Sequence, residues 1–112
     1  MSSDSVVGID IGGANTKIAS ADGNVTTFYL PLWKDADLES VLLRAKFDFK
    51  PDEVGIVLTG EMADRFISKR EGVLYIASAV KSVFDSAYFF DVHGRFSRYI
   101  QDPKLNAASN WV

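Results

Sequence analysis

The feature that most constrains this chain is a short apolar segment that runs into a double glycine. Val6–Ile11 is mostly apolar and β-branched, and Gly12-Gly13 closes it. This is the pattern of a buried strand that ends in a tight turn. Residues 16–21 follow as a second strand. Because glycine has no Cβ, the backbone between the two strands can turn sharply and approach a ligand closely. The chain therefore opens with a predicted strand–turn–strand element.

Polar side chains crowd this turn in a way that suits an anion. Successive backbone N–H groups in a glycine turn can converge on phosphate oxygens. Asn15 and Thr16 add side-chain donors, and Lys17 adds a positive charge. We therefore expect Gly12, Gly13, Asn15 and Thr16 to bind phosphate groups. A plain hairpin without a ligand is the alternative, and the two commoner glycine-rich phosphate motifs are absent.

Asp10 lies two residues before the glycines, inside the first predicted strand. A carboxylate beside phosphate donors calls for a cation between them. Mg²⁺ bound to phosphate usually takes only one or two protein carboxylates. We therefore expect Asp10 to hold Mg²⁺, with a turn-capping role for its carboxylate as the alternative.

The rest of the chain predicts an α/β domain. Asp22-Gly23-Asn24 marks a hairpin turn into a third strand at 25–30, which Pro31 stops. Helices at 38–50 and 73–84 have apolar residues at helical spacing. Strands at 54–59 and 87–92 alternate with them, and His93-Gly94 turns the chain into 95–100. The order β-β-β-α-β-α-β predicts a mixed sheet whose first three strands are antiparallel, with helices packed on it.

A second polar group follows the fourth predicted strand. Ligands of open α/β sheets gather at the carboxyl ends of the strands. We expect Thr59 and Gly60 to donate to phosphate there, and Glu61 to bind a metal or act as a base. The alternative is an ordinary connection with Glu61 near a helix start, where the helix dipole favours it. For Asp91 and His93 we favour plain turn residues over functional ones.

Composition excludes several classes of partner. The net charge is −3, from 12 basic and 15 acidic side chains, so nothing favours binding to nucleic acid. Cysteine is absent, which excludes disulfides and thiolate metal sites. No apolar run approaches the roughly 20 residues of a membrane helix. We expect a cytoplasmic protein that acts on small molecules.

Five segments together resemble an archaeal hydantoinase/oxoprolinase-like family of tetrahydromethanopterin-linked C1 transfer and methanofuran biosynthesis. That family lies within the superfamily of acetate and sugar kinases, Hsp70 chaperones and actin. The first segment resembles the phosphate-1 element of the superfamily, and the five in order are similar to this family in particular. The segments span residues 8–17, 31–34, 59–64, 69–73 and 108–111.

The resemblance implies a transferase that joins an aminomethylfuran diphosphate to the phenol oxygen of γ-glutamyltyramine and expels diphosphate. It implies that Asp10 binds Mg²⁺, that Lys17 neutralises the leaving group, and that Glu61 is a candidate base. The small-molecule partners are then the diphosphate substrate and the phenolic acceptor. The implied substrate contacts are Trp33, Lys34 and Asn110.

The resemblance also implies a ribonuclease H-like (actin-like ATPase) half-domain over residues 1–112, with a second half after Val112. Because the site of such folds lies between two halves, we expect little catalysis by this chain alone. One alternative is an ATP-dependent sugar-kinase-like or oxoprolinase/hydantoinase-like enzyme. Another is a non-catalytic nucleotide-binding or assembly module. An exposed cleft-facing surface is compatible with a homo-oligomer.

Overall fold

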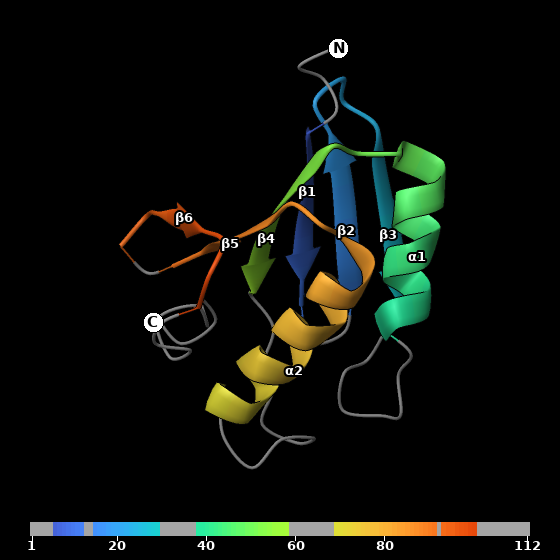
Figure 1. Ribbon diagram of the computed structural model, residues 1–112. Helices are drawn as coiled ribbons and strands as arrows, with labels where there is room; N and C mark the ends of the chain where they lie inside the picture. Colours follow the sequence, from blue (N-terminus) through green and yellow to red (C-terminus); the bar gives the residue numbers. More distant parts are fainter. Residues whose placement is uncertain (1–5, 13–14, 30–37, 59–68, 92, 101–112) are drawn as a thin grey trace.

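The computed structural model describes residues 6–12, 15–29, 38–58, 69–91 and 93–100 (Figure 1). Within these ranges the elements follow the order predicted from the sequence. They are β1 (Val6–Ile11), β2 (Asn15–Ser20), β3 (Val25–Tyr29), α1 (Leu38–Phe49), β4 (Glu53–Leu58), α2 (Lys69–Val83), β5 (Ala87–Phe90) and β6 (Phe96–Ser97).

The described strands form one six-stranded sheet in the order β3-β2-β1-β4-β5-β6. Strands β1, β2 and β3 pair antiparallel, which confirms the predicted meander. Strand β4 pairs parallel with both β1 and β5, as the intervening helices require. Strands β1 and β4 therefore end at the same edge of the sheet. The mixed α/β architecture is confirmed, and the finer ribonuclease H-like assignment stays a prediction.

One face of the sheet, called here the covered face, packs against both helices (Figure 1). Alternate strand residues point into this layer because side chains of a strand alternate between its two faces. The helices contribute apolar residues at helical spacing, as predicted. The buried apolar residues on the strands are Val7, Ile9, Ile11, Ile18, Val54, Ile56, Leu58, Ala87 and Phe89. The helical ones include Leu38, Leu42, Ala45, Val73, Ile76, Val80 and Val83.

Polar contacts fasten the two helices to each other. The Lys46 ammonium on α1 donates to the carbonyl oxygen of Val83 at 2.9 Å, which satisfies a carbonyl at the end of α2. The Ser82 hydroxyl donates to a carboxylate oxygen of Glu39 at 2.7 Å. Neither helix is long and apolar enough to cross a bilayer, and this holds for every helix in the described ranges.

The loop between β2 and β3 is the predicted tight turn. Gly23 adopts a positive φ of 95° and donates its N–H to the carbonyl oxygen of Ser20 at 3.1 Å. The Asp22 carboxylate accepts from the Ser20 hydroxyl and from the backbone of Asn24. These bonds lower the pKa of Asp22, the Ser20 hydroxyl most.

The last hairpin departs from the sequence prediction. The strand expected at 87–92 ends at Phe90, and the strand expected at 95–100 is confined to Phe96–Ser97. Asp91 forms the turn instead, with its backbone N–H donating to the carbonyl oxygen of Arg95 at 2.8 Å. The turn predicted at His93-Gly94, with Asp91 as a turn residue, is confirmed, whereas the two strands are shorter than apolar composition indicated.

Candidate functional site

The turn between β1 and β2 lies at the edge where β1 and β4 end. The Gly12 N–H donates to the carbonyl oxygen of Asn15 at 2.9 Å, so the strands are joined by a tight hairpin. Ile11 pairs with Thr16 just inside it. The structure therefore confirms a strand–turn–strand element. Gly13 lies outside the described residues.

Asp10 and Lys17 lie directly opposite each other on adjacent strands. Side chains in such cross-strand positions have Cβ atoms about 4.5–5.5 Å apart. Both project from the open face, our name for the sheet face opposite α1 and α2. Asn15, two residues before Lys17 on β2, shares that side and is exposed. The structure thus brings together the side chains of Asp10, Lys17 and Asn15, a carboxylate, an amine and an amide, on one side of the turn.

Thr16 projects to the other side. It is completely buried, on the same face of β2 as Ile18. Among the residues that the structure describes, its hydroxyl has no hydrogen-bond partner. Leaving a buried polar group unpaired costs about 1–3 kcal/mol. Three polar residues that are adjacent in sequence, Asn15, Thr16 and Lys17, are therefore divided by the strand pleat, with Thr16 on the covered face and the other two on the open face.

The open face is hollowed beside Asp10 and Lys17. The groove has a volume of about 360 Å³ and is apolar apart from these two residues. That volume is near the lower end of the roughly 300–1,000 Å³ typical of small-molecule sites. Sequence reasoning did not identify this groove. Its lining residues are Val6, Val7, Gly8, Ile9, Asp10, Lys17, Ala19, Gly55, Val57 and Phe96.

The arrangement fits a hydrated Mg²⁺ better than a metal caged by protein alone. No group of three or more His, Asp or Glu side chains that would hold a metal occurs among the described residues. Asp10 supplies one carboxylate, which is sufficient when phosphate oxygens and water complete the octahedron. The binding of Mg²⁺ by Asp10 stays a prediction.

Several predicted site residues belong to segments that the structure does not describe. Thr59, Gly60 and Glu61 follow directly in sequence after β4, whose last residue lies at the same edge as the β1–β2 turn. Their roles stay predictions, as do those of the remaining substrate contacts. The predicted site residues that lie outside the described ranges are Gly13, Trp33, Lys34, Thr59, Gly60, Glu61 and Asn110.

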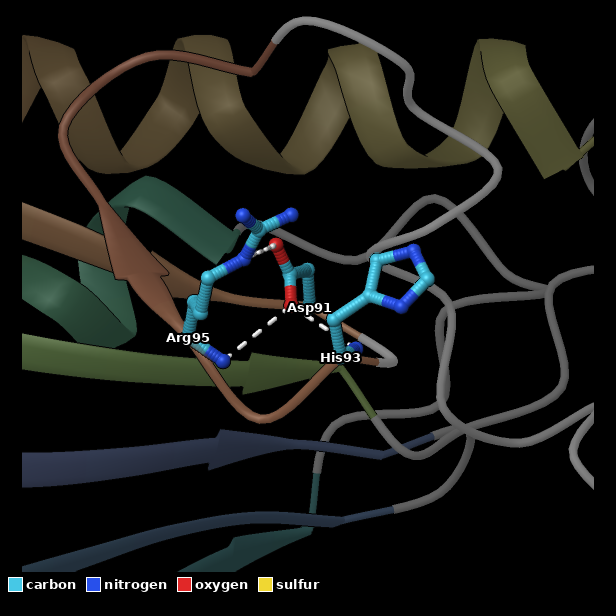
Figure 2. A network of polar contacts seen from close by, with 3 residues as sticks. All are labelled: Asp91, His93 and Arg95. Atoms are coloured by element: carbon cyan, nitrogen blue, oxygen red, sulfur yellow. Dashed lines mark hydrogen bonds and ion pairs between the residues drawn. The ribbon is translucent and has the colours of Figure 1, made fainter.

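The Asp91 carboxylate contacts His93 and Arg95 of the turn that follows it (Figure 2). One carboxylate oxygen accepts the backbone N–H groups of His93 and Arg95 at 2.8 and 3.1 Å. The other lies 3.6 Å from Nε of Arg95. Desolvation raises the pKa of Asp91, but the N–H groups of Arg95 and His93 outweigh it, and the net pKa is below its ordinary value. This geometry confirms the turn interpretation for Asp91, and His93 is an exposed turn residue.

Comparison with known proteins supports the family that the five segments resemble. No family model matches the chain. The chain is 40% identical over 114 aligned residues, or 95% of its length, to the (4-{4-[2-(gamma-L-glutamylamino)ethyl]phenoxymethyl}furan-2-yl)methanamine synthase of Methanocaldococcus jannaschii. It spans 34% of that relative's length. The similarity supports the methanofuran-biosynthesis family, whereas the hydantoinase and actin-like superfamily assignment stays a prediction.

Proposed function

We propose that this chain is the diphosphate-binding part of a methanofuran-biosynthesis synthase. The reaction joins an aminomethylfuran diphosphate to the phenol oxygen of γ-glutamyltyramine and releases diphosphate. The observation that carries the proposal is the Asp10–Lys17 pair, held in register beside a tight glycine turn on the open face. The M. jannaschii relative supports it, since its name describes a product in which a phenoxymethyl group joins a furan.

The chemistry is a substitution at the carbon that carries the diphosphate. A bond forms from the phenol oxygen to that carbon, and the bond from carbon to the bridging oxygen breaks. Diphosphate leaves with the electron pair, and the phenol proton passes to a base, for which Glu61 is the candidate. Negative charge grows on the leaving group, so fixed positive charge near it lowers the barrier.

Lys17 would neutralise that charge, since it lies opposite Asp10 on the open face beside the turn. Asp10 would hold Mg²⁺ there, which supplies additional positive charge to the diphosphate when bound. Asn15, exposed on the open face, offers an amide donor to a phosphate oxygen, whereas the predicted phosphate contact by the Thr16 hydroxyl does not fit, because Thr16 is buried on the covered face. No ATP hydrolysis enters this scheme.

A second candidate is a non-catalytic nucleotide-binding or assembly module. The open face favours it, because Val6, Val25 and Phe96 expose large apolar side chains there or at the adjoining edge. Exposed apolar side chains that gather on one face can mark an interaction surface. Tight ATP binding without turnover would support this module, whereas ATP turnover without diphosphate release would support a kinase-like enzyme.

A chimera tests the proposed reaction. This chain would replace the matching third of the M. jannaschii synthase, and the product would be assayed with aminomethylfuran diphosphate and γ-glutamyltyramine. We expect ether formation with equimolar diphosphate release, and loss of both in the Asp10→Asn chimera. A folded chimera that forms no ether, beside an active parent enzyme, would refute the proposal.

A further inference from the structure

The floor of the open-face groove is made by a row of residues with little or no side chain. Gly8 lies at the centre of this row, paired with Ala19 on β2 and with Gly55 on β4. A row of paired residues crosses a sheet perpendicular to its strands, so the absence of side chains at neighbouring positions leaves a trough rather than an isolated notch. The trough lies over Ala19, Gly8 and Gly55, where larger residues would project side chains from the open face.

An aromatic ring forms one wall. Phe96 on β6 bends over Gly55, where a Cβ added to the glycine would come within 3.3 Å of the Phe96 ring. The Phe90 ring supports Phe96 from beside it, with the two centroids 5.1 Å apart in a tilted arrangement. Phe96 nevertheless stays 52% exposed, so much of its surface is available to a ligand. A ring that entered the trough would contact an aromatic neighbour, a favourable arrangement.

Charge is confined to one end of the groove. Asp10 and Lys17 are the charged residues in its lining, and both lie two positions nearer the glycine turn than the Gly8–Ala19 pair. An occupant must therefore be apolar along its body and ionic at the end nearest the turn. A small flat ring that carries a diphosphate has this distribution, with the anion at Lys17 and the ring over Gly8.

We propose that the open-face groove is the subsite for the ring of an aryl-methyl diphosphate substrate, with Gly8 and Gly55 as its floor and Phe96 as its wall. This inference rests on the proposed function, because it takes the diphosphate to bind at the β1–β2 turn. It adds a specificity element to that site: the two glycines select for a ring by leaving room for one.

Amide chemical shifts of the ¹⁵N-labelled chain, titrated in Mg²⁺ with two probes, test the subsite. Inorganic diphosphate is expected to shift the signals of Asp10, Gly12, Asn15 and Lys17 around the turn, and not those of Gly8 and Gly55. Aminomethylfuran diphosphate is expected to shift these and also Gly8, Gly55 and Val57, and to bind roughly tenfold more tightly because the ring is buried. Shifts confined to the turn with both probes would overturn the subsite and leave the proposed function standing.

Gly8→Val fills the trough and supplies the matched variant. The Cβ position of residue 8 has its nearest contact at 3.9 Å, so the β-carbon of the new side chain meets no clash. We expect it to abolish the tighter binding of the furan compound and to leave the affinity for inorganic diphosphate unchanged. Thr27→Val places a valine on the open face outside the groove, where it exchanges a hydroxyl for a methyl group, and should change neither.

Three other outcomes are decisive. Equal affinity of wild type and Gly8→Val for the furan compound would overturn the subsite. Groove signals that move with protein concentration in the absence of ligand would show that a second copy of the chain covers the groove, and would also overturn it. A failure of both probes to shift any signal would refute the proposed function itself and the subsite with it.

Discussion

The two faces of the sheet differ although the same strands build both. On β1, the covered face takes Val7 and Ile9, each no more than 2% exposed, whereas the open face takes Gly8 and the half-buried Asp10. The covered face carries large apolar side chains that interlock with two helices. The open face carries the Asp10–Lys17 pair and a groove whose floor is the row Ala19, Gly8 and Gly55. Burial on one face holds the strands in place, which leaves the other face able to position ligand-binding groups.

The largest expected effect is on the free energy of unfolding, and it should differ between two neighbouring residues of β4. Ile56 is fully buried on the covered face, whereas its neighbour Val57 lines the groove. Ile56→Ala should lower the free energy of unfolding by about 2–5 kcal/mol because it leaves a cavity. Val57→Ala should cost less than about 1 kcal/mol. Urea denaturation of both variants measures the contrast, and similar losses would show that the open face is packed as tightly as the covered one.

The next effect concerns ligand affinity rather than stability. Lys17→Met removes the ammonium opposite Asp10 while it keeps most of the apolar stem. A hydrogen bond to a charged group contributes roughly 1.5–3 kcal/mol, so the Kd for diphosphate should rise about 10- to 150-fold. Lys17→Arg is the control that keeps the charge. Calorimetry gives the Kd of each variant for diphosphate. An unchanged Kd for Lys17→Met would show that Lys17 does not bind diphosphate.

The elements of both faces were predictable from local pattern. The run Val6–Ile11 has strand composition, the double glycine stops it, and the covered-face residues of α1 repeat at helical spacing. These signals are local because a strand or helix needs only its own period to bury one side. Pairing directions followed as well, since a helix between two strands of one sheet implies a parallel crossover.

The groove was not predictable, because it depends on register between distant segments. Gly8 and Gly55 are separated by 46 residues that include α1, and each glycine by itself indicates nothing beyond a weak strand position. Only their direct pairing creates a trough, and crossover geometry rather than sequence pattern decides that pairing. The position of Phe96 over Gly55 adds a third segment.

The polar cluster at the turn was predicted as a single set, and the pleat divides it. Asn15, Thr16 and Lys17 alternate between faces because β2 begins at Asn15, one residue earlier than composition indicated. A turn one residue longer would have exchanged their faces. Alternation within the strand was predictable, but which residue begins it was not.

A smaller effect on the free energy of unfolding is expected at Thr16, on the covered face next to the β1–β2 turn. Thr16→Val replaces a buried hydroxyl that has no partner with a methyl group of similar shape. The free energy of unfolding should rise by about 1 kcal/mol, because an unpaired buried polar group is removed. Thermal denaturation without ligand measures it. A loss of stability would indicate that the Thr16 hydroxyl is satisfied in solution by water or by the protein.

The smallest effect belongs to the β5–β6 turn, at the end of the sheet. The pKa of Asp91 is lowered in the folded state, so its contribution is present above the unfolded-state pKa and is lost as pH falls through the folded value. Amide exchange in the hairpin should therefore speed up, relative to the rest of the sheet, below about pH 4. Asp91→Asn should weaken this pH dependence. An identical pH profile in the variant would show that the Asp91 carboxylate does not cause it.

Diphosphate is proposed to bind to the open face through Asp10 at the glycine turn. Calorimetric titration of inorganic diphosphate, with and without Mg²⁺, into wild type and Asp10→Asn tests it most directly. We predict that Mg²⁺ strengthens binding to wild type and that this Mg²⁺ dependence disappears in Asp10→Asn, with the unfolding midpoint little changed. Equal, Mg²⁺-dependent affinity in the two proteins would contradict the claim.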